Sequence, residues 1–276
     1  MAITTLAGVE SGLVPAGIFA KTSSNQTDSQ NYWLTSFYTV GYPPAATAPS
    51  PGLSGAALTS YEGQIPFTNP VSGNTYLAGL RRPFFSTTVN ASQRTLMIVD
   101  RLWHNSGIDL TVTTAQTVNS VTFPARDLNQ STNGEGVYLW LEVSSTLGAG
   151  LPAVTVGYTN SAGTAGRTGS LLMSFRTAAT QGHVFPIGLD TGDTGVRSIQ
   201  SITFSVAVLT GAIHLVAYRP IAMINNASAA SNYSVDDALT LAMPQLWNDS
   251  VPQNVSIPAG NGSADGGAIT VQYAQG

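Results

Sequence analysis

Apolar and polar residues alternate with a period of two through much of the segment from Arg94 to Pro220. Residues 137–143 show this most clearly, because alternate positions place one set on each face of a strand: Val137, Leu139, Leu141 and Val143 on one, Tyr138, Trp140 and Glu142 on the other. Successive side chains of a β-strand point to opposite faces of its sheet, so this pattern predicts strands. Residues 154–158, 171–175 and 202–208 repeat it.

Further strand candidates bring the total in this segment to seven or eight: residues 94–99, 108–113, 118–123 and 212–218. Thr210 and Gly211 form a two-residue link that predicts a tight hairpin between residues 202–208 and 212–218. Many short strands separated by turns rich in Gly, Asn, Ser and Thr are typical of sandwiches and jelly rolls. We therefore predict an all-β, β-sandwich or jelly-roll-like domain over residues 86–222.

Residues 1–85 are predicted to form an extended N-terminal arm and a loop-rich region, because Pro and Gly interrupt every apolar stretch. An extended arm can add a strand to the edge of a neighbour's sheet. Apolar residues of the arm are the expected anchors: Leu6, Val9, Leu13, Ile18 and Phe19. On this interpretation, removing residues 1–21 leaves the domain folded but abolishes binding to the partner.

Residues 223–276 are predicted to be a C-terminal extension that completes or decorates the sandwich. Ser234 is a candidate cap for a short helix over residues 234–242, which Pro244 would end. Residues 254–257 and 268–273 are strand candidates.

The chain is poor in charge: 9% of its residues are charged, its formal net charge is −4, and Lys21 is its only lysine. Ordinary soluble domains contain roughly 25% charged residues, and charge is depleted in the cores of protein interfaces. We therefore expect a surface that packs against copies of itself and other proteins. Without a basic stripe or a long apolar run, neither nucleic acid nor membrane is an expected partner. Without cysteine or the features of a secretory signal, we expect synthesis in a cytoplasm.

The sequence Asp190-Thr191-Gly192-Asp193-Thr194-Gly195 contains the Asp-Thr-Gly triplet of aspartic proteases twice. Their chemistry needs two triplets that approach from separate lobes or subunits, and two copies in one loop do not meet that requirement. A Gly-rich turn, with aspartates bonded to local backbone, is the preferred interpretation. Whether Asp190 and Asp193 bind a cation such as calcium stays open.

Other candidates for chemistry are sparse. His104, His183 and His214 have no metal-ligand spacing, and His214 is predicted to be packed and hydrogen-bonded within a strand. No Gly-x-Ser-x-Gly elbow marks a nucleophile. The candidates for the two carboxylates of a glycosidase are Asp127, Glu135 and Glu142, but an aromatic interface with a paired carboxylate is the preferred interpretation. We predict a non-enzymatic protein with no catalytic residue, cofactor or metal, in which Tyr138 and Trp140 serve a protein interface.

Six short stretches resemble, as a set, a family of tailed-bacteriophage virion proteins: PVSGNTYL (70–77), DRLWHN (100–105), FPARD (123–127), STNGEG (131–136), YTNSAGTAGRT (158–168) and GDTGVRS (192–198). The resemblance implies a structural virion protein, which we interpret as a capsid decoration or cement protein on the capsid surface. Its expected partners are the major capsid protein and copies of itself, as a trimer in preference to a dimer. A tail, collar or spike protein is the alternative. A glycan- or receptor-binding module with Tyr138, Trp140 and Trp103 as its stacking platform is the second.

Overall fold

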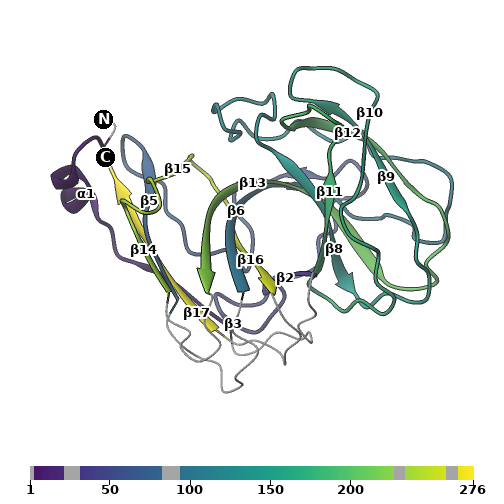
Figure 1. Ribbon diagram of the computed structural model, residues 1–276, viewed down its shortest axis with the longest axis horizontal. Coiled ribbons are helices and arrows are strands. Elements are labelled where there is room, and N and C mark those ends of the chain that lie inside the picture. The colour runs from purple at the N-terminus through teal and green to yellow at the C-terminus, as the bar shows by residue number, and fades with distance from the viewer. Residues whose placement is uncertain (1–2, 22–31, 83–93, 227–233, 259–266) are drawn as a thin grey trace. The chain divides into compact units, whose positions relative to one another are not determined.

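The computed structural model describes residues 3–21, 32–82, 94–226, 234–258 and 267–276 (Figure 1). The fold is nearly all β, with 44% of residues in strands and 3% in helix, and its sheets pack in a sandwich- or barrel-like arrangement. This confirms the predicted fold class. The chain forms two compact units, the first from Met1–Ala46, Ser60–Asp100 and Ile221–Gly276, the second from Thr47–Thr59 and Arg101–Pro220. The predicted boundary at residues 85 and 86 lies outside the described residues.

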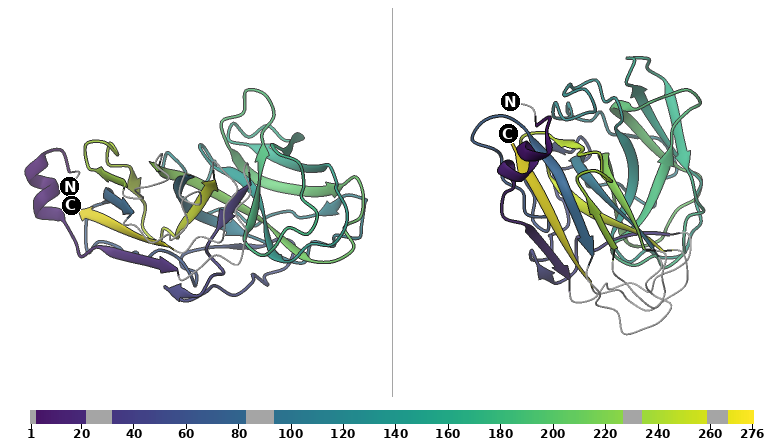
Figure 2. Two further views of the ribbon diagram at one scale, coloured as in Figure 1. Left: turned by 60° about the horizontal axis from the view of Figure 1, so that its bottom comes forward. Right: turned by 60° about the vertical axis from the view of Figure 1, so that its left-hand side comes forward.

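The first unit contains an antiparallel sheet in the order β14-β5-β17-β1-β3 (Figure 2). Its strands are β14 (Ser234–Asp237), β5 (Thr75–Arg82), β17 (Gly267–Gln275), β1 (Gly17–Lys21) and β3 (Gly41–Tyr42), and β15 (Gln245–Leu246) also pairs with β5. Phe19 of β1 lies opposite Ile269 of β17, and both side chains are buried. Ile18 lies opposite Thr270 on the other face and is 52% exposed. At β1 the sheet therefore has one buried face and one open face.

A second layer covers the buried face within the first unit. It contains β2 (Trp33–Thr35), β16 (Pro252–Pro258) and the first part of β6 (Arg94–His104), and the end of β13 (Ala212–Asn226) adds Ile224. Side chains of both layers share one apolar core: Phe19, Ile65, Leu77, Leu80, Leu96, Ile98, Ile224, Leu246, Ile269, Val271 and Tyr273. The first unit is thus a small two-layered sandwich.

The second unit contains a curved sheet in the order β13-β8-β11-β10-β9-β12-β7 (Figure 1). Its strands beyond β13 are β8 (Tyr138–Ser145), β11 (His183–Gly188), β10 (Arg167–Leu171), β9 (Val154–Asn160), β12 (Val196–Phe204) and β7 (Gln116–Thr117). The short β4 (Ala56–Ala57) pairs with the end of β6. Two irregularities in register between β12 and β9 bend the sheet as β-bulges do. β8 is buried on both faces from Leu139 to Ser144.

The N-terminal segment is not the extended arm that we predicted. Residues Leu6–Gly12 form the helix α1, and the Thr5 hydroxyl caps it by accepting a hydrogen bond from the Gly8 amide (3.0 Å). β1 is hydrogen-bonded on one side to β17 and on the other to β3. Removing residues 1–21 would therefore delete an internal strand and the buried Phe19 side chain, so the truncated domain is not expected to stay folded.

The predicted helix over residues 234–242 and the predicted hairpin are both wrong for one reason, which is that pairing across the sheet overrides local signals. The predicted helix over residues 234–242 begins as strand β14, which pairs with β5, and Asp237 then forms a turn by accepting the amides of Leu239 and Thr240. The hairpin at Thr210 does not form, because β12 pairs with β9 and β7 while β13 pairs with β8. The predicted strands at 108–113 and 118–123 do not form, and of residues 171–175 only Leu171 lies in a strand. The strands predicted at 254–257 and 268–273 are confirmed by β16 and β17.

Candidate functional site

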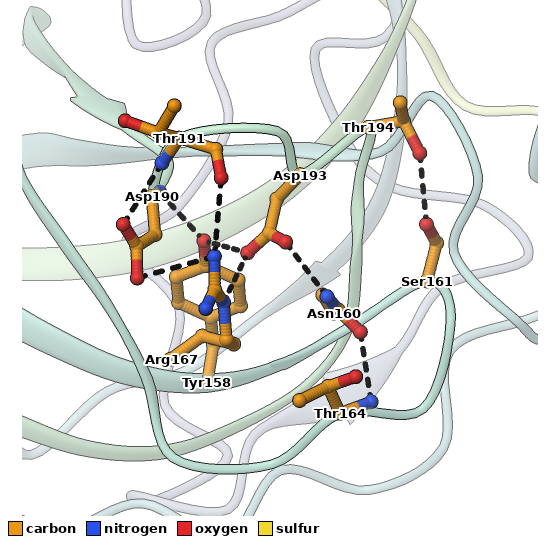
Figure 3. Close-up of polar contacts among 9 residues, drawn as sticks. All are labelled: Tyr158, Asn160, Ser161, Thr164, Arg167, Asp190, Thr191, Asp193 and Thr194. Atoms are coloured by element: carbon orange, nitrogen blue, oxygen red, sulfur yellow. Dashed lines mark hydrogen bonds and ion pairs between the residues drawn. The ribbon is translucent and has the colours of Figure 1, made fainter.

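A polar cluster in the second unit gathers around the double Asp-Thr-Gly sequence (Figure 3). Tyr158 and Asn160 occupy alternate positions of β9, so their side chains leave the same face of the strand. Arg167 lies opposite Tyr158 in the register of β10 with β9, which brings it to that face. The loop between β11 and β12, residues 189–195, closes over them and supplies Asp190 and Asp193.

Asp193 is the centre of the cluster. Its carboxylate accepts hydrogen bonds from the Tyr158 hydroxyl (2.6 Å), from Asn160 Nδ2 (2.7 Å) and from Arg167 Nε (2.9 Å). The Tyr158 hydroxyl in turn accepts the backbone amide of Asp190 (2.8 Å). The side chain of Asp193 is only 4% exposed. The carboxylate therefore ties two neighbouring strands to the loop that follows β11.

Arg167 also bridges to the start of the loop. One of its terminal nitrogens, Nη2, lies 3.2 Å from Asp190 Oδ2 and donates to the Thr191 carbonyl oxygen (3.2 Å). Asp190 accepts the Thr191 amide through its other oxygen (2.8 Å), as a turn aspartate does. The predicted Gly-rich turn with local aspartate bonding is confirmed. The hydrogen bonds that side chains of β9 and β10 make to this turn were not predicted from the sequence.

The electrostatics of the cluster follow from these contacts. The hydrogen bond from Tyr158 and the bonds from Arg167 and Asn160 lower the pKa of Asp193 to about 2. Burial, together with Asp193 as the acceptor, raises the pKa of Tyr158 to about 12. The pKa of the Arg167 guanidinium is raised by its bond to Asp193. Each group therefore keeps one charge state through neutral pH, which suits a clamp that holds the loop in place.

The cluster offers little to a metal ion. The Arg167 guanidinium lies between the two aspartates, and a cation at Asp190 and Asp193 would have to displace it (Figure 3). Among the described residues, no group of three or more His, Asp or Glu side chains is arranged to hold a metal. The same part of the chain contains no helix long and apolar enough to span a bilayer.

A second polar cluster of the second unit is fully buried. Arg101 Nη1 and Glu142 Oε2 are 2.7 Å apart, and both side chains are 0% exposed. His104 and His214 belong to the same cluster, and His214 is packed and hydrogen-bonded, as predicted. Asp100 and Arg101 are neighbours in the sequence but have different partners, because successive residues of β6 point to opposite faces. Asp100 accepts hydrogen bonds from Ser250 Oγ and from the Val251 amide.

The three candidate glycosidase carboxylates each have their own hydrogen-bond or salt-bridge partners. Glu142 pairs with Arg101, while Asp127 accepts hydrogen bonds from a hydroxyl and four amides: Ser131 Oγ and the backbone nitrogens of Asn129, Ser131, Gly134 and Glu135. Glu135 accepts the Thr194 hydroxyl (2.8 Å). Gly134 is required in this loop, since its φ is +82° and a Cβ there would lie 1.9 Å from the Val196 carbonyl oxygen.

The predicted interface residues divide into exposed and buried side chains. Leu6, Leu13 and Ile18 are 69%, 48% and 52% exposed, and Tyr138 is 37% exposed. Val9 is buried against Ala78 and Ala274, and Phe19 lies in the core of the first unit, so neither is an anchor on a partner. Trp140 is fully buried, with its ring 4.0 Å from that of Tyr218.

Burial also affects the predicted glycan platform. Trp103 is fully buried and donates through Nε1 to the Ser54 carbonyl oxygen (3.1 Å), and Trp140 is buried against Tyr218. Tyr138 is the one member of the three with an exposed side chain. No observation in the described residues favours stacking of a sugar on these rings.

Three groups of polar contacts could not be predicted from the sequence, because their partners are distant along the chain. Tyr158 and Asp193 are 35 positions apart, and Arg101 and Glu142 are 41 apart. Lys21 is buried, and its ammonium donates to three carbonyl oxygens, those of Thr39, Pro43 and Pro44. Its status as the only lysine was a signal that could have singled it out.

Comparisons with known proteins establish no family. No protein-family model matches the chain, and no curated protein matches it in sequence. Among solved structures, it is similar to the VP2 subviral particle of infectious bursal disease virus, with 9% identity and a TM-score of 0.24 over 96% of this chain and 82% of the other. T=1 particles derived from the same virus give 9% identity and a TM-score of 0.18, over 96% and 79%. At such TM-scores the likeness supports no argument about function.

Proposed function

We propose that this protein is a structural component of a bacteriophage virion, a decoration or cement protein that binds the assembled capsid shell across capsomer boundaries. The sequence resemblance to virion proteins of tailed phages is one support. The low charge of the chain is another, because protein interfaces lose charged residues at their cores. The proposed partners are the major capsid protein and further copies of this chain.

The observation that carries the proposal is a set of exposed apolar side chains in the N-terminal part of the first unit. Leu6 lies on α1, Leu13 follows it, and Ile18 lies on the open face of β1. Tyr42 of β3, 59% exposed, lies opposite Ala20 of β1, two residues beyond Ile18 on the same open face. We name these four side chains the apolar patch. Its burial against a shell protein would recover free energy that the isolated chain leaves unused.

Cement action requires that binding favour the closed lattice over separated subunits. A ligand that binds the assembled state stabilises it by mass action. A contact of about 800 Å² per partner is the usual size of a stable interface. Several contacts per oligomer would add avidity through a high effective concentration. A symmetric homo-oligomer, a trimer in preference to a dimer, fits this requirement.

Co-sedimentation with purified phage shells tests the proposal. The triple variant Leu6→Gln, Leu13→Gln, Ile18→Thr is expected to lose binding by at least tenfold while its circular dichroism stays that of the wild type. The matched control replaces three exposed leucines of the second unit, Leu151→Gln, Leu172→Gln and Leu209→Gln, which are 65–69% exposed, and is expected to bind normally. Equal binding by wild type and the first variant would refute the role of the apolar patch.

Electron microscopy of virions carrying the labelled protein separates the virion alternatives. Regular copies over the shell are expected for a cement protein, whereas a few copies at one vertex would indicate a collar, tail or spike protein. Saturable binding of a purified glycan would instead indicate a recognition module. Native mass spectrometry of the free protein measures the oligomeric state.

A further inference from the structure

The buried polar cluster of the second unit combines a salt bridge with two imidazoles. Arg101 and His104 come from β6, Glu142 from β8 and His214 from β13. Glu142 and His214 lie directly opposite each other in the register of β8 with β13. The four side chains belong to residues that are at most 4% exposed. We name these four residues the histidine cluster.

His104 accepts a hydrogen bond at the nitrogen that would otherwise take up a proton. Its Nδ1 lies 3.3 Å from Arg101 Nε, and a guanidinium nitrogen can only donate. The ring is therefore neutral, with its proton on Nε2. Protonation at Nδ1 would remove this hydrogen bond and place a second positive charge against the guanidinium in a site closed to water.

His214 is held at both ring nitrogens. Nδ1 lies 2.8 Å from the Asn105 carbonyl oxygen, which only accepts, and Nε2 lies 2.7 Å from Ser144 Oγ. Nδ1 therefore carries a proton, and Nε2 faces the Ser144 hydroxyl, which also donates to the Ala212 carbonyl oxygen (3.4 Å). The charges that face His214 are Glu142, which favours a protonated ring, and Arg101, which opposes it. Those facing His104 are Arg101 and His214, which both oppose protonation.

The balance of charge is what makes the cluster sensitive to acid. With both imidazoles neutral, the charges of Glu142 and Arg101 offset each other at 2.7 Å. Protonating both rings would add two positive charges near Arg101, among side chains that have almost no access to solvent. Adding charge to a buried site costs free energy, because the charge loses its hydration.

We propose that the histidine cluster is an acid-sensitive lock, in which proton uptake by His104 and His214 opens the second unit where β6, β8 and β13 meet. Burial lowers the pKa of His104 to about 2, and burial also lowers the pKa of His214. The unfolded chain binds protons at a pKa of about 6.5. The stability of the second unit is therefore complete above that pH and falls as the pH decreases below it.

Urea unfolding of the full chain between pH 6 and pH 5, followed by circular dichroism, tests the lock. Each histidine that is neutral in the folded state is expected to raise the unfolding equilibrium constant by up to tenfold per pH unit. In the double variant His104→Gln, His214→Gln, the change of the unfolding equilibrium constant between pH 6 and pH 5 is expected to be smaller by a factor of up to about 100. His183 is also buried, so His183→Gln is the matched control. It is expected to remove only the contribution of one histidine to the pH dependence of unfolding. An unchanged pH dependence in the double variant would overturn the proposal.

A measurement on the wild-type protein covers the case in which the double variant does not fold. The three imidazoles can be followed by their carbon and nitrogen chemical shifts in nuclear magnetic resonance spectra. At pH 5.5 the folded protein is expected to show His104 neutral with its proton on Nε2. A charged His104 ring, or a proton on its Nδ1, would contradict the geometry on which the lock depends.

Discussion

The salt bridge between Arg101 and Glu142 leads to the most quantitative prediction. Its two atoms are 2.7 Å apart and both side chains are 0% exposed, so removing one partner leaves the other as a buried charge. Such a loss costs about 3–5 kcal/mol. We therefore expect Glu142→Gln and Arg101→Met each to destabilise the second unit by about 3–5 kcal/mol.

The double variant separates the buried-charge effect from simple loss of packing. In the double variant neither charge remains, so it is expected to be less destabilised than the two single variants added together. The difference, an interaction energy of about 2–3 kcal/mol, is within the range for residues in direct contact. The partly exposed pair Arg167 and Asp190 is a control, and Asp190→Asn is expected to cost less than about 1 kcal/mol.

Amide hydrogen exchange in β8 and β13 is the appropriate assay, because a chain with two compact units need not unfold in one step. A loss of 3–5 kcal/mol corresponds to exchange that is about 10²–10⁴ times faster at amides that open with the second unit. Single variants whose protection changes by less than tenfold would refute the reasoning. So would costs that simply add in the double variant.

Three further predictions concern single side chains. Phe19→Ala removes a buried ring of the first core and is expected to cost about 3–5 kcal/mol in urea unfolding, whereas Ile18→Ala, on the open face, should cost about 1 kcal/mol or less. Asp193 has a lowered pKa, so its stabilising contribution should disappear as pH falls from about 4 to about 2. Acid unfolding of Asp193→Asn should lack that part of the transition. Burial lowers the pKa of Lys21 to about 8, so wild-type stability should rise between pH 8 and 10, and thermal unfolding of Lys21→Met should show no such rise.

The alternation of residues 137–143 was enough to predict a strand, because the period of two is a property of the backbone itself. The same reasoning predicted β16 and β17 and the all-β class. Alternation states which side chains share a face, but it does not state whether that face is covered. Trp140 shows the limit: its face is buried against Tyr218 of β13, a residue 78 positions away, so a predicted interface aromatic is a core residue.

The N-terminal segment shows the same limit in a different form. Its Gly and Pro content excluded a long helix, yet Thr5 was enough to cap one of seven residues. No local feature indicated that β1 would pair with β17 at the far end of the chain. The partner of a strand is chosen by the burial of the whole sheet, and sequence separation carries no information about it.

The sequence alone therefore determined the strand-rich class, the scarcity of charge, the turn at Asp190 and the resemblance to virion proteins. Tertiary structure decided which apolar side chains remain exposed as the apolar patch, and which charges meet in the histidine cluster. The physical reason is the range of the interactions. Backbone periodicity and turn chemistry act within a few residues, whereas burial and ion pairing join side chains that only the folded chain brings together.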